Sequence, residues 1–141
     1  MALRDTGIAY ELATNLSFDD AVAGCRAALP KEGFGVLTEI DIQAKLKEKL
    51  GVDVEPNLIL GACHPASAHQ ALLVVPEAGV LLPCNVTVSV EDGRTIIRAM
   101  NPEGAMKMLG NPELDEIAVD VGARLRRVMA ALSLASEEAA Q

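Results

Sequence analysis

Aromatic side chains are scarce in this chain of 141 residues, which has no tryptophan and only Tyr10, Phe18 and Phe34 as aromatic residues. Hydrophobic residues nevertheless make up 50% of the chain, so an aliphatic core is expected. A chain of this size and composition forms one folded domain, because it can bury enough apolar surface to offset the entropy lost on folding. The scarcity of aromatic rings also removes the stacking platforms with which proteins bind single-stranded nucleic acids.

Positive charge is scarce as well. The chain has 12 lysines and arginines against 20 aspartates and glutamates, which gives a formal net charge of -8. Nucleic-acid binders draw much of their affinity from neutralising phosphates with lysine and arginine. The charge balance therefore argues against a nucleic-acid partner.

Long apolar runs are absent from the sequence, and the first residues do not read as a signal peptide. We therefore expect no membrane partner. The cysteine count is 3, and an odd number of cysteines without a secretory signal indicates free thiols in a reducing compartment. A cytoplasmic location follows as the expectation.

The hydrophobic pattern predicts an α+β domain. Alternation of apolar and polar residues is clearest at positions 82–90, and Asp92-Gly93 supplies the turn into a partner strand at 94–100. Further strands are expected at 10–16, 34–42 and 58–60.

Strict alternation has a particular consequence in the strand at 34–42. It places Val36, Thr38 and Ile40 on one face and Glu39 and Asp41 on the other. The two carboxylates would then share a face and could serve in acid–base chemistry, although solvation of Glu39 and helix capping by Asp41 are the simpler interpretation.

Helices are expected between these strands, each with a recognisable start. Ser17 and Asp41 have the side chains of N-cap residues, and Pro65 suits the first position of a helix. Two Asn-Pro pairs, at 101–102 and 111–112, predict a short helix and a long terminal one. One antiparallel-rich sheet covered by the first and last helices is the natural packing. The domain is expected to comprise residues 1–135, followed by a flexible tail at 136–141.

Four segments carry a resemblance to a known family. They are GFGVLTEIDI at 33–42, ILGACHP at 59–65, LLPCNV at 81–86 and MNP at 100–102. Together they resemble the uncharacterised bacterial and archaeal "domain of unknown function 302" family, with His64 where that family more often has asparagine. The resemblance implies a fold similar to the TATA-binding-protein half-domain, with helices against a curved antiparallel sheet, and it suggests a homodimer. It implies no established activity, and likeness of fold does not bring DNA binding with it.

Cys63 and His64 are the first candidates for a functional site. Cys63 ends a strand just before the expected helix at Pro65, where a helix N-terminus favours a thiolate. The structural alternative is that Cys63 packs at the joint while His64 caps the helix.

Cys84 and Asn85 complete the candidate ligand site. The alternation at 82–90 places Cys84 on the core face, so packing is its simplest role. If Cys84 approaches Cys63 across the sheet, however, the pair would form a dithiol or, with His64, a soft-metal site. Cys25 falls on the apolar stripe of the first helix, and Arg94 and Arg98 could hold an anion, although solvated charge is the ordinary role of such residues.

The sequence therefore predicts a homodimeric, non-enzymatic module that binds a small molecule near Cys63, His64, Cys84 and Asn85. No cofactor is expected, because dinucleotide fingerprints, phosphate loops and nucleophile elbows are missing from the sequence. The alternatives are a thiol-based redox or soft-metal protein and a purely structural interaction domain. Enzymatic activity would rest on Cys63 alone.

Overall fold

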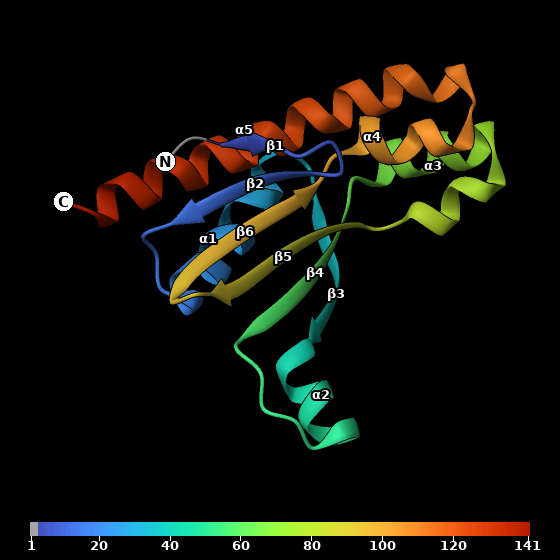
Figure 1. Ribbon diagram of the computed structural model, residues 1–141. Coiled ribbons are helices and arrows are strands. Elements are labelled where there is room, and N and C mark those ends of the chain that lie inside the picture. The colour runs from blue at the N-terminus through green and yellow to red at the C-terminus, as the bar shows by residue number, and fades with distance from the viewer. Residues whose placement is uncertain (1–2) are drawn as a thin grey trace.

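The computed structural model describes residues 3–141, and an open six-stranded sheet forms its centre (Figure 1). The strand order is β1-β2-β6-β5-β4-β3, and every neighbouring pair is antiparallel. The strands are β1 Arg4–Asp5, β2 Ala9–Thr14, β3 Gly35–Asp41, β4 Asn57–Cys63, β5 Cys84–Glu91 and β6 Arg94–Met100. The predicted α+β class with an antiparallel sheet and packed helices is therefore confirmed.

Two helices, α1 (Phe18–Lys31) and α5 (Asp115–Ala139), pack on one face of the sheet and enclose the main core (Figure 1). The core is aliphatic, as expected, and Tyr10 and Phe34 are the aromatic residues buried within it. Its largest fully buried aliphatic side chains come from both layers: Leu12, Leu29, Leu60, Ile97, Leu125, Met129 and Leu132. Among the residues that the structure describes, no such layer of helices covers the opposite face of the sheet (Figure 1).

A second, smaller core lies beyond one end of the sheet. It is formed by Ala71, Ala78, Met106, Leu114 and Ala118. The surrounding elements are α3 Pro65–Val74, η1 Pro76–Leu81, α4 Pro102–Met106, η2 Lys107–Leu109 and η3 Pro112–Leu114. Of these elements, η1, α4 and η2 form one wall of the cleft on the open face that is described below.

The predicted helix starts at Ser17, Asp41 and Asn101 are confirmed by side-chain hydrogen bonds to backbone N–H groups, whereas the Asn111-Pro112 pair begins η3 and the long helix α5 starts at Asp115. Ser17 accepts from Asp20 N over 3.1 Å at the start of α1, and Asp41 accepts from Ala44 N over 2.9 Å. The latter begins α2 (Ile42–Leu50), which ends at Gly51 in the left-handed conformation, with φ +68°. Asn101 caps α4 in the same way as Ser17 and Asp41 cap their helices.

The alternation predicted for the strand at 34–42 is wrong, because β3 contains an irregularity. Val36 pairs with Ala62 but Thr38 pairs with Gly61, so Leu37 is an extra residue between them. Such a bulge reverses the faces of all residues that follow it. Val36 thus packs against the core, whereas Thr38 lies beside Gly61 on the opposite face. Glu39, now on the helical side, pairs with Arg26 of α1.

Two further details differ from the predicted pattern. The short strand β1 and the 3-10 turn η1 carry too few residues to give a periodic signal and were not expected. Helix α5 continues to Ala139, so it includes most of the segment 136–141 that was expected to be a tail. A long-range contact holds the start of this segment in place: Ser136 is buried and its hydroxyl accepts a hydrogen bond from Asn15 N over 2.8 Å.

None of the helices within residues 3–141 is both long and apolar enough to cross a bilayer.

Candidate functional site

The sequence-predicted site residues divide between two places. Cys63, His64 and Cys84 line one small cavity on the helical side, together with residues of α3 and α5. Asn85 follows Cys84 on β5 and therefore lies on the opposite face of the sheet, where it lines a different and much larger cleft. The structure thus brings three of the predicted residues together but separates Asn85 from them.

The cavity at Cys63 is too small for an organic ligand. Its volume is about 20 Å³, and roughly 10–15 Å³ on the same measure is the space that one water molecule needs. The cavity is also lined largely by apolar side chains such as Leu82, Met106 and Val121. A small-molecule site at Cys63 and His64 therefore has no room in this conformation.

The pKa values of all three thiols are raised, which disfavours their ionised form. Burial raises the pKa of the half-buried Cys63, which is opposite to the direction expected from the helix N-terminus. Burial, with a smaller contribution from the neighbouring Cys63, raises the pKa of Cys84 to about 11. Cys25 is buried in the core, where desolvation raises its pKa to about 12. These thiols are protonated at neutral pH.

His64 has a structural role at this joint. Its Nδ1 lies 2.8 Å from the Ser67 hydroxyl and accepts from Ser67 N over 3.4 Å, so the ring caps α3. The other edge of the ring packs closely against Gly33 and makes an edge contact with Phe34, with ring centroids 5.8 Å apart. The capping interpretation of His64 is therefore confirmed. Within residues 3–141, histidine, cysteine and acidic side chains form no group of three that could hold a metal ion.

A cleft of about 570 Å³ lies on the open face of the sheet. Its floor consists of outward-facing residues of three neighbouring strands: Ala9 of β2, Arg98 and Met100 of β6, and Asn85 and Thr87 of β5. Thr87 is paired with Arg98 in the ladder, so these two floor side chains are direct cross-strand neighbours. We call this hollow the open-face cleft.

The walls of the open-face cleft come from segments outside the sheet. Ile8 in the β1–β2 turn forms one side, while Leu81, Ala105 and Met108 from η1, α4 and η2 form another. Ile8 and Met108 are 72% and 83% exposed, so both apolar side chains stand at the rim rather than in the core. The lining is predominantly apolar, with Asn85, Thr87 and Arg98 as its polar side chains.

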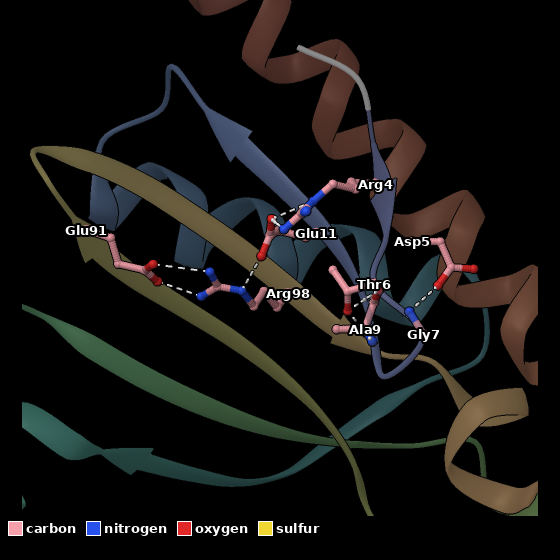
Figure 2. A network of polar contacts seen from close by, with 8 residues as sticks. All are labelled: Arg4, Asp5, Thr6, Gly7, Ala9, Glu11, Glu91 and Arg98. Carbon is pink, nitrogen blue, oxygen red and sulfur yellow. Dashed lines mark hydrogen bonds and ion pairs between the residues drawn. The ribbon is translucent and has the colours of Figure 1, made fainter.

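The β1–β2 turn is held in place by a connected set of hydrogen bonds (Figure 2 shows part of it). The Asp5 carboxylate accepts from Gly7 N over 2.8 Å and from the Asn101 amide over 3.1 Å. Asn101 N in turn donates to Ile8 O over 2.7 Å. The hydrogen bonds from Gly7 and then Asn101 lower the pKa of Asp5, because both stabilise its ionised form. This wall of the cleft is therefore preorganised.

A row of alternating charges crosses the open face beside the cleft (Figure 2). Arg4 donates to Glu11 over 2.7 Å, and Arg98 Nε donates to the other oxygen of Glu11 over 2.7 Å. Arg98 Nη1 and Nη2 donate to the two oxygens of Glu91 over 2.5 and 3.1 Å. We call these four residues the charge row.

The charge row fixes the ionisation of its carboxylates. Arg98, followed by the Ser89 hydroxyl, holds the pKa of Glu91 at about 2. Hydrogen bonds from Arg4 and Arg98 lower the pKa of Glu11. The carboxylates reciprocally raise the pKa of Arg98, so the whole row is ionised at neutral pH.

Sequence reasoning identified Asn85 as a site residue and Arg98 as a possible anion-binding residue, but it did not place them in one site and missed the other residues that line the cleft. Thr87 and Asn85 share a face through simple alternation, which was readable from the strand at 82–90. Leu81, Ala105 and Met108 line the cleft because η1, α4 and η2 lie beside the open face of the sheet. No local sequence pattern predicts that tertiary arrangement.

The comparisons with known proteins concern family and fold. The crystal structure described as "uncharacterized conserved protein DUF302 from Bacillus stearothermophilus" is similar to this chain, with a TM-score of 0.82 and 32% sequence identity. That match covers 88% of this chain and 97% of the other. A search of curated proteins gives no match. The family model described as "Domain of unknown function DUF302" matches residues 10–132, and the chain therefore belongs to this family.

Proposed function

We propose that this protein is a cytoplasmic, non-enzymatic, homodimeric module that binds a small molecule in the open-face cleft. The observation that carries the proposal is the cleft itself. Its volume of about 570 Å³ falls within the range of roughly 300–1,000 Å³ that is typical of small-molecule sites. Of the site residues predicted from the sequence, Asn85 belongs to the proposed site, whereas Cys63, His64 and Cys84 do not. The other residues of the proposed site are those that line the open-face cleft with Asn85.

The lining of the cleft suits binding more than catalysis. The Asn85 amide and the Thr87 hydroxyl can donate and accept hydrogen bonds without changing their charge. Met100 and Met108 supply flexible apolar contacts that adapt to the shape of a ligand. Cysteine, histidine and carboxylate side chains do not occur among the described residues that line the cleft, so none of these residues supplies the Thr87 hydroxyl with a general base.

The thiol-based alternative is less well supported. A redox or soft-metal role for Cys63 requires an accessible thiolate, but burial raises its pKa and its cavity is about 20 Å³. If the cleft binds no ligand, the alternative of a purely structural interaction domain is favoured.

The homodimer is part of the proposal, and helix α2 supports it. The helix has no buried residue, and its apolar stripe continues to Leu50, which is 70% exposed. Val52 and Val54, in the loop that follows, are 42% and 38% exposed. An amphipathic helix ordinarily buries its apolar stripe, and a second copy of the chain would cover this one. We call Leu50, Val52 and Val54 the α2 patch.

The ligand-binding proposal can be tested with an environment-sensitive dye. The apolar amine N-phenyl-1-naphthylamine is titrated into the full-length protein, and its fluorescence is expected to rise and to saturate. Asn85→Phe places a large side chain on the cleft floor at an exposed strand position, so this variant should fold and lose at least about tenfold in affinity. Ala13→Phe is the matched control, because Ala13 lies on the same sheet face but outside the cleft lining.

Two results would reject the proposal. Dye binding that survives Asn85→Phe unchanged would locate the binding elsewhere on the protein. The absence of saturable binding to the wild type would leave the cleft without a small-molecule role.

A further inference from the structure

We infer that the ligand of the open-face cleft is an electrically neutral molecule, mostly apolar but with a hydrogen-bonding group, rather than an anion. This inference rests on the proposed function and adds to it the chemical class of the ligand. It departs from the interpretation that the arginines of β6 hold an anion.

The charge row accounts for the neutrality of the site. Arg98 is the charged side chain that lines the cleft among the described residues, and its guanidinium already donates to both Glu11 and Glu91. Arg4 completes the row at the far side of Glu11. Two arginines and two glutamates cancel in this row, so no net positive charge is available to a ligand.

An anion would meet an unfavourable environment. To reach the Arg98 guanidinium it would have to displace a carboxylate or lie next to one, and close like charges repel. Glu11 is only 19% exposed in its side chain, so this carboxylate is fixed beside the cleft rather than free to swing away.

The remaining lining favours a neutral molecule. Ile8, Leu81, Met100 and Met108 offer apolar surface, and an ionised group buried against it would lose its hydration without a counter-charge. Asn85 and Thr87 lie on the floor between these walls and provide neutral hydrogen-bonding partners. A hydroxyl, amide or un-ionised aryl amine group on an apolar body matches this arrangement.

A matched pair of dyes tests the inference. N-phenyl-1-naphthylamine is neutral, and 1-anilinonaphthalene-8-sulfonate has the same ring skeleton with one added negative charge. Only the fluorescence component that Asn85→Phe abolishes is counted, so that binding outside the cleft is removed from both titrations. The neutral dye should bind at least about tenfold more tightly than the sulfonate.

A change in the charge row should alter this preference. Glu91→Gln removes one negative charge beside Arg98, so the sulfonate is expected to bind several-fold more tightly while the neutral dye changes by less than about twofold. Glu113→Gln is the control, because it changes the net charge equally but lies in a separate surface hollow between α3 and α5. Glu11→Gln repeats the test from the other side of Arg98 if Glu91→Gln does not fold.

The outcomes separate the two claims. Tighter binding of the neutral dye, together with a gain for the sulfonate in Glu91→Gln alone, supports the inference. Equal or tighter cleft binding of the sulfonate to the wild type overturns the neutral-ligand inference while the proposed function stands. If neither dye binds at the cleft, the proposed function fails and this inference fails with it.

Discussion

Gly104 of α4 lies against Gly7 of the β1–β2 turn so closely that a Cβ atom at position 104 would be 2.0 Å from the Gly7 carbonyl oxygen. The contact joins two walls of the open-face cleft, because both glycines line it. Backbone cannot give way as a flexible side chain can, so the absence of a side chain at position 104 sets the distance between these walls.

Gly104→Ala is therefore expected to destabilise the fold and to increase the distance between the two walls of the cleft. The added methyl group must push α4 away from the turn, and overpacking of this kind costs about 1–3 kcal/mol. Urea denaturation measures the loss, and dye affinity measures the effect on the cleft. Gly35→Ala is the control, since nothing lies within 4 Å of a Cβ built there. Equal stability of the two variants would mean that the turn is not held against α4.

Acid should weaken the fold in part through Glu91. Its pKa is lowered from 4.5 to about 2 in the folded protein, so its contribution to stability is present above pH 4.5 and is lost as the pH falls toward 2. The side chain is 45% exposed, which makes the contribution modest because solvent screens the pair.

The measurement is denaturation at several pH values between 5 and 2, with wild type and Glu91→Gln side by side. The variant should lose less stability over this interval, since glutamine does not titrate. Parallel pH profiles would show that the pair with Arg98 contributes nothing measurable.

The cysteines should react slowly in the native protein. Because the pKa values of Cys25 and Cys84 are raised to about 12 and about 11, iodoacetamide at neutral pH should leave both unmodified until the protein is unfolded. Cys63 is half-buried and should react more slowly than a free thiol. Mass spectrometry before and after denaturation follows each thiol, and a Cys63 that reacts faster than glutathione would favour the redox alternative.

The α2 patch should control self-association. Leu50→Glu places a charge on its most exposed apolar residue, and we expect the dimer to weaken at least about tenfold. Leu134→Glu on α5 is the control, because Leu134 is 61% exposed and distant in sequence from α2. Sedimentation velocity across a concentration series distinguishes the two variants. A wild type that is monomeric throughout would remove the homodimer from the proposal.

The elements of the fold were largely predictable because they carry local signals. N-cap side chains at Ser17 and Asp41 start α1 and α2 as predicted, and the Asp92-Gly93 turn joins β5 to β6. The exception within a predicted element is the bulge at Leu37, which reverses the faces of the following residues. The bulged residue is neither a glycine nor a proline, so the sequence gives no local signal for it. The homodimer and the likeness to the TATA-binding-protein half-domain stay predictions.

The candidate site was less predictable, because it depends on contacts between distant segments. The sequence directed attention to Cys63 and Cys84, whose chemistry is conspicuous, but burial of these thiols is a property of the assembled core. The charge row depends on contacts of Glu11, Arg98 and Glu91 across neighbouring strands. The sequence of a single strand does not predict which strands pair with it.

The step from Cys84 to Asn85 has a consequence for how this protein can change over time. Consecutive residues of β5 project to opposite sides of the sheet, so Cys84 packs in the core and Asn85 lines the cleft. Substitutions at Asn85 and Thr87 can therefore alter the lining of the cleft without disturbing the packing of Val86 and Val88, which point to the core. If the cleft binds a ligand as proposed, the outward-facing positions of β5 could change its specificity while the inward-facing positions keep the core packed.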